Sequence, residues 1–381
     1  MTRLALTRLT LTNFRNYSGL RLDVSAHLIA LSGPNGAGKT NLLEAISLLS
    51  PGRGLRGASF DELAHLETAN SWAIAAEVAT PHHDVKLGTG WSDTATEAGS
   101  TGRVVLIDGH LQKSSGALGD HMRLLWLTPA MDGLFSGPTG DRRRFMDRLV
   151  ATFDPEHNSR VAVFEKVMRE RNLLLQEIRA DMVWMGSLEA HMAEAAVAIA
   201  AARLSAIEAL QKNINGTRSE SAFPHALIAI AGEIENLVKA MPAVRAEDEY
   251  RKLLADSRVA DRAAGRTLAG THRSDLNVVH GPKSMPAANC STGEQKALLI
   301  GLILAQARAV KSVAEVAPVL LLDEVAAHLD RPRREGLFAA LEALGSQAWM
   351  TGTDSHLFEG LRHNAQCFHV EAGTIEEMKR A

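Results

Sequence analysis

The chain has 381 residues, of which 46% are hydrophobic and 22% charged, so it can bury a sizeable core and divide into two or three domains. It contains two cysteines, Cys290 and Cys367, without a CxxC pair, which indicates neither a disulfide framework nor a zinc site and favours a reducing cytoplasm. Because the formal net charge is −3, any contact with nucleic acid must come from a local basic patch.

The first third of the chain has the pattern of β-strands. Apolar and polar residues alternate over 4–24 around a polar turn at 13–19, and the apolar run 28–31 follows. Two further strands are expected at 72–78 and 103–107. The N-terminal pattern differs from the apolar block of a signal peptide, and no run approaches the length of a membrane span, so we expect no association with a membrane.

A phosphate-binding loop follows the apolar run. Residues 33–40 fill every fixed position of the pattern G-x-x-x-x-G-K-[ST], and a helical pattern follows over 41–46. In such loops the glycines let backbone N–H groups converge on phosphate oxygens, the lysine reaches the β- and γ-phosphates, and the threonine hydroxyl holds Mg²⁺. The strand before the loop and the helix after it disfavour the alternative of an ordinary glycine-rich turn. The residues expected to bind the nucleotide are Gly33, Pro34, Asn35, Gly36, Ala37, Gly38, Lys39, Thr40 and Asn41.

Helical patterns dominate the middle of the chain. Asp154 and Pro155 have the character of an N-cap followed by a first helical residue, and one apolar helical face then extends to Ile178. Two more helices are expected at 187–212 and 246–264. A short strand at about 226–230 is expected between them.

This helical block divides the chain. Strand patterns resume at 276–279, and the strongest remaining motifs come only after them. We therefore expect residues 1–135 and 271–381 to form one ATPase domain, into which residues 136–270 are inserted as a mostly helical lid domain.

Two carboxylates follow an apolar strand pattern near the C-terminus. The run 319–322 ends in Asp323 and Glu324, the arrangement by which nucleotide hydrolases hold Mg²⁺ and polarise the attacking water. Buried carboxylates cost free energy unless they have a partner, which disfavours a purely structural role. The predicted catalytic residues are thus Lys39, Asp323 and Glu324, and the predicted metal ligands are Thr40 and Asp323. A further strand at 348–353 ends in small polar residues.

The segment 291–295, Ser-Thr-Gly-Glu-Gln, precedes a long apolar helix. Ser291 and Glu294 have the spacing of a capping box. Taken alone, this segment fits a capped core helix as well as it fits a nucleotide contact.

The order of these motifs resembles that of ATP-binding-cassette (ABC) ATPases: a phosphate loop, an S-x-G-x-Q helix start, an apolar strand ending in Asp-Glu, and then Leu329-Asp330. Over essentially its whole length the chain is similar to the RecF family of bacterial DNA-repair proteins. The resemblance rests on 13–17 (Asn-Phe-Arg-Asn-Tyr), 39–46 (Lys-Thr-Asn-Leu-Leu-Glu-Ala-Ile), Arg53 with Arg56, 142–147 (Arg-Arg-Arg-Phe-Met-Asp) and 270–276 (Gly-Thr-His-Arg-Ser-Asp-Leu). The chain departs from the family at Thr271 and Ser274, where Pro and Asp are common, and at Glu324, where Asp is frequent and Glu favours hydrolysis.

The resemblance implies an α/β fold with an ABC-type P-loop ATPase head and a cytoplasmic homodimer that depends on ATP and Mg²⁺. It implies that Ser291 and Gly293 of one subunit contact the γ-phosphate bound to the other, with Asp330 serving the same dimer. It also implies slow ATP hydrolysis, binding of double-stranded DNA at gaps and stalled forks, and RecR, with RecO and RecA, as partners. The candidate DNA contacts are Arg53, Arg56, Arg142, Arg143, Arg144 and Arg148.

Other interpretations remain for these features. Each arginine could instead belong to a solvated face or to an ion pair within the chain. The whole chain could be an SMC-type or transporter-type ATPase subunit that drives a partner protein, although the inserted helices and arginines disfavour this. A phosphotransferase built on the same loop would need an acceptor pocket and would leave the S-x-G-x-Q segment without a role.

Overall fold

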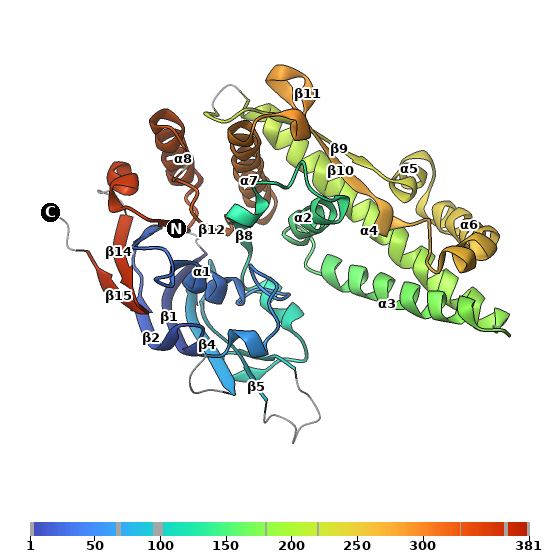
Figure 1. The fold of residues 1–381 in the computed structure, drawn as a ribbon, viewed down its shortest axis with the longest axis horizontal. Coiled ribbons are helices and arrows are strands. Elements are labelled where there is room, and N and C mark those ends of the chain that lie inside the picture. Colours follow the sequence, from blue (N-terminus) through green and yellow to red (C-terminus); the bar gives the residue numbers. More distant parts are fainter. Residues whose placement is uncertain are drawn as a thin grey trace. The chain divides into compact units, whose positions relative to one another are not determined.

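The computed structural model describes residues 4–65, 70–93, 102–179, 181–218, 221–327, 329–361 and 365–378. The chain forms two compact units (Figure 1). One unit comprises Met1–Asp132, Thr217–Pro224 and Thr292–Ala381, and the other comprises Gly133–Gly216 and His225–Ser291.

The first unit contains an antiparallel sheet with the strand order β2-β1-β4-β5-β6-β7. Its strands are β1 (Ala5–Phe14), β2 (Tyr17–Asp23), β4 (Ser71–Ala79), β5 (Asp84–Ser92), β6 (Val104–Ile107) and β7 (His110–Leu111). Along β4, buried Trp72, Ile74 and Val78 alternate with more exposed residues, as in a sheet with one face on the core. The alternation in the sequence therefore predicts which face of this sheet is buried.

A second sheet in this unit is mostly parallel and has the order β15-β14-β3-β13-β12-β8, with only β15 antiparallel to its neighbour. Its strands are β3 (Leu28–Ser32), β8 (Leu124–Leu127), β12 (Val319–Leu322), β13 (Ala348–Gly352), β14 (Ala365–Glu371) and β15 (Thr374–Glu377). Every residue of β3, β8, β12 and β13 is buried, because both faces of this part of the sheet are covered.

The side-chain amide of Gln347 connects the two sheets. Its Oε1 accepts a hydrogen bond from Leu6 N (2.9 Å), and its Nε2 donates to Leu6 O (2.8 Å). Gln347 is buried and lies directly before β13, so strands that are 341 residues apart in the sequence are held in a fixed relation.

Among the described residues of the first unit, the α-helices are α1 (Lys39–Ser47), α7 (Thr292–Ala314) and α8 (Arg331–Leu344). By length and composition alone α7 could cross a membrane, so the expectation that no run approaches that length is wrong. However, most of the helix is buried inside the protein. The helix contacts β8 and α8, as expected of a core helix.

The second unit is mostly helical (Figure 1). Its helices are α2 (Thr139–Ala151), α3 (His157–Gln176), α4 (Met182–Gly216), α5 (Glu233–Ala240) and α6 (Ala243–Ala264), and its small antiparallel sheet has the order β11-β10-β9, with β9 (Ala226–Ala231), β10 (Asp275–His280) and β11 (Met285–Pro286). Figure 1 shows α3 and α4 running side by side, with α6 next to them. Their apolar faces form one core that includes Phe164, Met192 and Tyr250.

Buried ion pairs cross this helical core. Arg171 of α3 is fully buried, and its guanidinium donates to Glu189 (3.1 Å) and to Asp261 (2.8 Å). It also donates to the Thr267 hydroxyl (2.9 Å) and to Leu254 O (2.8 Å). Because one side chain bonds to partners from α4, α6 and the segment after α6, it fixes how these elements pack.

Several boundaries differ from the expectations. The helix expected to begin at Pro155 begins at His157, because the Asp154 carboxylate accepts from Glu156 N (3.1 Å) in a turn before the helix. Ile178 lies beyond the end of α3 and is 94% exposed. The sequence pattern did not predict α2, α5, β5, β14 or β15.

The end of the inserted part also differs from the expectation. The sequence placed it after residue 270, whereas the second unit continues to Ser291. The physical reason is that β10 pairs with β9 over its whole length, from Asp275 opposite Ala231 to His280 opposite Ala226. The segment after residue 270 therefore completes a sheet of the second unit.

We predict that Arg171→Ala destabilises the protein by about 3–5 kcal/mol, because it leaves the buried carboxylate of Asp261 without its cation. Thermal unfolding followed by circular dichroism measures the effect. Arg331→Ala is the matched control, since its side chain is 82% exposed and water screens its pair with Glu335. Equal shifts of the unfolding midpoint in the two variants would contradict the role assigned to Arg171.

Candidate functional site

The glycine-rich loop lies between β3 and α1, and its backbone requires glycine at two positions. Gly33 has φ +149°, and a Cβ there would lie 2.1 Å from the carbonyl oxygen of Val370 in β14. Gly38 has φ +114°, and its Cβ would lie 2.4 Å from Asn16 Nδ2. Side chains are thus excluded on steric grounds, and the loop keeps the open backbone that a phosphate cradle needs.

Lys39, the first residue of α1, is buried beneath this loop. Its ammonium donates to Gly33 O (2.7 Å) and Pro34 O (2.8 Å). Burial lowers the pKa of Lys39, and the negative charges of Glu324 and Asp323 partly oppose this effect. The ammonium of Lys39 is therefore held by hydrogen bonds to two loop carbonyls and is attracted by two carboxylates.

The metal ligands expected from the sequence lie in direct contact. The Thr40 hydroxyl is 3.0 Å from Asp323 Oδ1 and 3.1 Å from Oδ2, although the two residues are 283 positions apart. Asp323 follows β12, and its backbone N donates to Leu127 O (2.8 Å) in β8. Asp323 is 5% exposed, and its carboxylate also accepts a hydrogen bond from Thr351 at 2.7 Å.

This oxygen pair suits Mg²⁺, which is bound in proteins by one or two carboxylates together with substrate phosphates and water. Among the described residues, no group of three or more His, Cys, Asp or Glu side chains is placed to hold a metal without such additional ligands. A hydroxyl, a carboxylate and a glycine-rich loop on one sheet edge are consistent with a metal that shares its coordination with a phosphate group.

Glu324 adopts a left-handed backbone conformation with φ +49°, which is uncommon for a residue with a side chain. Its backbone N donates to the Thr351 hydroxyl at 2.8 Å. The structure thus brings Lys39, Thr40, Asp323 and Glu324 together at the carboxyl ends of β3 and β12.

Sequence reasoning missed the residues that support the loop from outside. Asn16 Nδ2 donates to Ala37 O (3.1 Å), and the Tyr17 hydroxyl donates to Gly38 O (3.1 Å). Asn16 Oδ1 accepts from Asn41 Nδ2 (2.7 Å) on α1. The stretch 13–17 stood out only through its family resemblance. The spacing of 21 residues between Asn16 and Ala37 gives no sign of their contact.

A second support lies behind α1, where the carboxylate of Glu44 is fully buried. Arg15 donates to both of its oxygens (2.9 and 3.0 Å), and Arg56 donates to Oε2 (2.9 Å) and also to Asn41 Oδ1 (2.8 Å). The guanidinium of Arg56, a candidate DNA contact, is thus engaged within the chain. Arg53, from the same loop, is exposed.

The residues expected to act across a dimer lie at two helix starts. Ser291 and Gly293 are exposed at the beginning of α7. Asp330 is the N-cap of α8, where its carboxylate accepts from Arg333 N at 2.9 Å, and it also remains exposed. Their expected contacts with a second subunit stay predictions.

The arginine-rich stretch of α2 is held by the stretch 270–276. Arg142 donates to both oxygens of Asp275 (2.8 Å each) and to the carbonyls of Phe135 (3.2 Å) and Gly137 (2.6 Å). Arg143 donates to Ser274 O (3.1 Å). Two of the stretches that carry the resemblance to the RecF family, 142–147 and 270–276, are therefore partners of one another in the second unit.

The remaining arginines of this region differ in exposure. Arg144 is 81% exposed and pairs with Asp141, whereas Arg148 lies over the ring of Phe145 with its guanidinium carbon 5.5 Å from the centroid. Arg273, which the sequence did not single out as a DNA contact, is exposed. Burial lowers the pKa of Arg143, and the positive charges of Arg203 and Arg273 lower it further. Arg144 and Arg273 are thus the arginines here that face solvent most openly.

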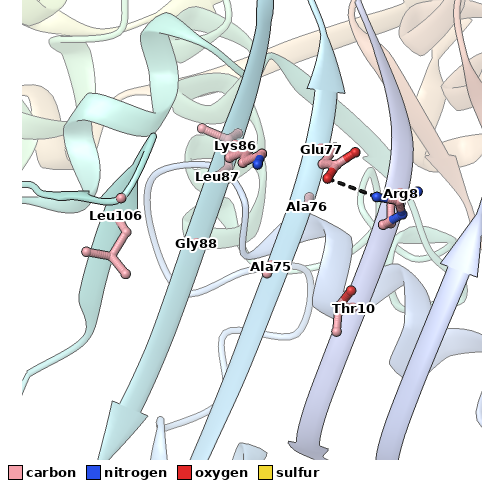
Figure 2. Close-up of a pocket in the computed structure, with 10 residues that line it drawn as sticks. Arg8, Thr10, Ala75, Ala76, Glu77, Lys86, Leu87, Gly88 and Leu106 are labelled. Carbon is pink, nitrogen blue, oxygen red and sulfur yellow. Dashed lines mark hydrogen bonds and ion pairs between the residues drawn. The ribbon is translucent and has the colours of Figure 1, made fainter.

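The outer face of the antiparallel sheet carries a separate hollow (Figure 2). Its floor is formed by small residues such as Thr10, Ala75 and Gly88, and the Arg8–Glu77 ion pair (3.0 Å) lies at its edge. The hollow lacks the glycine-rich loop and the paired carboxylates of the site at the end of β3, so it is the weaker candidate for chemistry.

Comparisons with known proteins agree with this arrangement. The model of the RecF/RecN/SMC N-terminal domain matches residues 5–376. The DNA replication and repair protein RecF of Mesorhizobium japonicum is 49% identical over 370 residues, which is 97% of this chain and 97% of that protein. RecF of Rhizobium leguminosarum bv. trifolii is 48% identical over 98% of this chain and 99% of its own length.

A solved structure has the same fold at lower identity. The recombination mediator protein RecF-ATP of the RecFOR pathway superposes with a TM-score of 0.84 at 22% identity, covering 99% of this chain and 100% of that one. The architecture is accordingly the mixed α/β ATPase head of RecF and SMC proteins. With near-complete coverage at almost half identity, the chain belongs to the RecF family of DNA replication and repair proteins.

Proposed function

We propose that this protein is an ATP-dependent recombination mediator that binds double-stranded DNA, dimerises on ATP and hydrolyses ATP slowly. In this proposal it acts in the cytoplasm in gap repair and replication-fork recovery, and it helps RecO and RecR to load RecA. Membership of the RecF family supports the role in DNA repair, and the similar solved protein is described as a RecF-ATP structure of the RecFOR pathway.

One observation carries the ATPase part of the proposal, namely the contact of the Thr40 hydroxyl with the Asp323 carboxylate beside the glycine-rich loop. A threonine that follows the loop lysine and a carboxylate at the end of another buried strand are the protein ligands of Mg²⁺ in P-loop NTPases. Bound there, Mg²⁺ would neutralise charge on the β- and γ-phosphates of ATP.

Hydrolysis then needs a base. A water oxygen attacks the γ-phosphorus, the bond from that phosphorus to the ADP oxygen breaks, and the water loses a proton to the Glu324 carboxylate. Lys39 stabilises the transferring phosphoryl group through its charge, once its ammonium exchanges the carbonyls of Gly33 and Pro34 for phosphate oxygens.

The dimer of our proposal rests on the family resemblance and on the exposed start of α7. The exposed start of α7, with Ser291 and Gly293, offers backbone N–H groups and the positive end of a helix dipole to an anion. In our proposal this helix start completes the site of the second subunit, so that ATP is bound between the two.

DNA binding is assigned to the exposed arginines. Arg142 is held by Asp275 and serves mainly to connect α2 with β10, whereas Arg144 and Arg273 of the same unit and Arg53 of the other face solvent. Arginine suits phosphate through its planar fork of donors, and phosphate contacts carry no sequence preference. The proposal therefore includes DNA binding that depends on salt and little on sequence.

We predict that Glu324→Gln retains ATP binding but loses about 100-fold or more in turnover, because a general base of this kind contributes at least that factor. Asp323→Ala should instead weaken Mg²⁺-dependent ATP binding itself. Steady-state hydrolysis and nucleotide titrations distinguish the two effects. Glu335→Gln, at an exposed glutamate of α8, is the control and should behave as the unmodified protein. Normal turnover in Glu324→Gln would refute the base assignment.

The dimer arrangement predicts complementation between two inactive variants. Ser291→Arg should bind ATP nearly normally yet fail to dimerise, whereas Lys39→Met should fail to bind ATP productively. Mixed dimers of the two contain one intact composite site, so the mixture should recover ATPase activity that neither variant has alone. If mixed dimers form, as shown by pull-down of differently tagged chains, but no activity returns, sites shared between subunits are ruled out.

For DNA, we predict that Arg144→Gln with Arg273→Gln weakens binding to duplexes of different sequence uniformly. The slope of log affinity against log salt should fall by about 0.9 for each lost phosphate contact. Fluorescence anisotropy at several salt concentrations measures it. Arg21→Gln with Arg331→Gln removes the same charge from side chains that are 64% and 82% exposed. An unchanged slope in the first pair of variants, or the same fall of the slope in both pairs, would show that DNA binds at another surface.

A further inference from the structure

Thr351 occupies an unusual position between the two acidic residues of the site. It lies in β13, is fully buried, and its hydroxyl contacts both residues that follow the neighbouring strand β12. Oγ1 donates to Asp323 Oδ1 at 2.7 Å and accepts from Glu324 N at 2.8 Å. A single hydroxyl thus links the carboxylate expected to hold Mg²⁺ with the backbone of the residue expected to act as base.

The direction of these hydrogen bonds is fixed by chemistry. A backbone N–H only donates and a carboxylate only accepts, whereas a hydroxyl has one proton to donate and two lone pairs to accept with. The Thr351 proton must therefore point to Asp323, while a lone pair receives the N–H of Glu324. A methyl group in the same place could satisfy neither partner.

The hydrogen bond to Glu324 N also bears on the orientation of the Glu324 side chain. With φ +49°, Glu324 holds a backbone conformation that residues with a Cβ rarely adopt, and such conformations persist only where the surroundings impose them. The direction in which the side chain leaves the backbone depends on this conformation. Thr351 therefore contributes to where the Glu324 carboxylate lies.

Sheet topology makes Thr351 a rigid support. β13 lies between β12 and β3, with Leu322 opposite Met350 on one side and Thr351 opposite Leu31 on the other. The backbone of Thr351 is thus fixed by the strand that leads into the glycine-rich loop, and its side chain is fixed by the strand that carries the two acids.

We propose that Thr351 is a positioning residue for ATP hydrolysis, which sets the Asp323 carboxylate for Mg²⁺ and the Glu324 carboxylate for the attacking water. This inference rests on the ATPase part of the proposed function. Thr351 acts through these two residues and takes no part in bond making or breaking. Partners of this kind, one layer behind a metal ligand, typically change metal affinity or activity by about 10–100-fold when they are lost.

Two matched pairs of variants isolate the hydroxyl. Thr351→Val removes the hydroxyl and keeps the shape of the side chain, so its comparison with the unmodified protein gives a first measure of what the hydroxyl contributes. Thr351→Ser and Thr351→Ala differ from one another only by a hydroxyl. Their comparison gives a second measure of its contribution, which serves if the valine variant folds poorly. Thr353→Val, at an exposed threonine two residues further on, is the control for the loss of any threonine hydroxyl nearby.

The readouts are turnover, KM for ATP and the Mg²⁺ concentration needed for half-maximal binding of a fluorescent ATP analogue. We expect Thr351→Val and Thr351→Ala to lose about tenfold or more in kcat and to need more Mg²⁺, with the binding of nucleotide in EDTA unchanged. Thr351→Ser should stay close to the unmodified protein. If Thr351 acts through the base, adding Thr351→Val to Glu324→Gln should cost less kcat than it costs alone.

Several outcomes would overturn the inference. Normal kcat and Mg²⁺ dependence in Thr351→Val, or equal defects in Thr351→Ser and Thr351→Ala, would show that the hydroxyl has no such role. If the unmodified protein does not hydrolyse ATP, or if Glu324→Gln hydrolyses normally, the proposed function fails. The Mg²⁺ titration then still decides whether Thr351 sets the Asp323 carboxylate. If the unmodified protein and Thr351→Val hydrolyse ATP equally well and Glu324→Gln does not, only the Thr351 inference is refuted.

Discussion

The parallel alignment of β3, β13 and β12 is the constraint on which the candidate site depends. Because the carboxyl ends of parallel strands lie at one sheet edge, residues from three distant parts of the sequence meet there. β3 supplies the glycine-rich loop, β12 supplies Asp323 and Glu324, and β13 supplies Thr351 between them. Complete burial of these strands fixes their register, since any shift would place hydrogen-bonding groups without partners in the core.

The second unit is organised by charge. Arg203, which is 2% exposed, donates to Asp147 (2.8 and 3.0 Å) and to Glu235 (3.0 Å), and Glu235 in turn accepts from Ser274 (2.8 Å). Arg142 and Asp275 extend this network at a less buried position. Losing one member leaves a buried charge without a partner, so such networks specify one packing arrangement. Arg144 and Arg273 lie outside this network, and both are exposed.

The parts of the fold that follow local rules could be predicted from the sequence. Strand alternation, the loop pattern and the apolar run before Asp323 depend on residues close together in the chain, and the structure contains a strand or loop at each of these places. The role of Asn16 could not be predicted, because it depends on a hydrogen bond to Ala37 that arises only from the tertiary fold. For the same reason the sequence does not show that the charge of Arg142, a candidate DNA contact, is matched by Asp275, 133 residues away.

In the proposed function, ATP bound at the edge of the parallel sheet brings two subunits together and prepares them to hold DNA. Sedimentation velocity of the unmodified protein with Mg²⁺ and either ADP or ATP, each with and without a short duplex, tests this claim most directly. We expect a monomer with ADP, a dimer with ATP, and a DNA-bound species that sediments as the dimer only with ATP. The same sedimentation coefficient with ADP and ATP would contradict it.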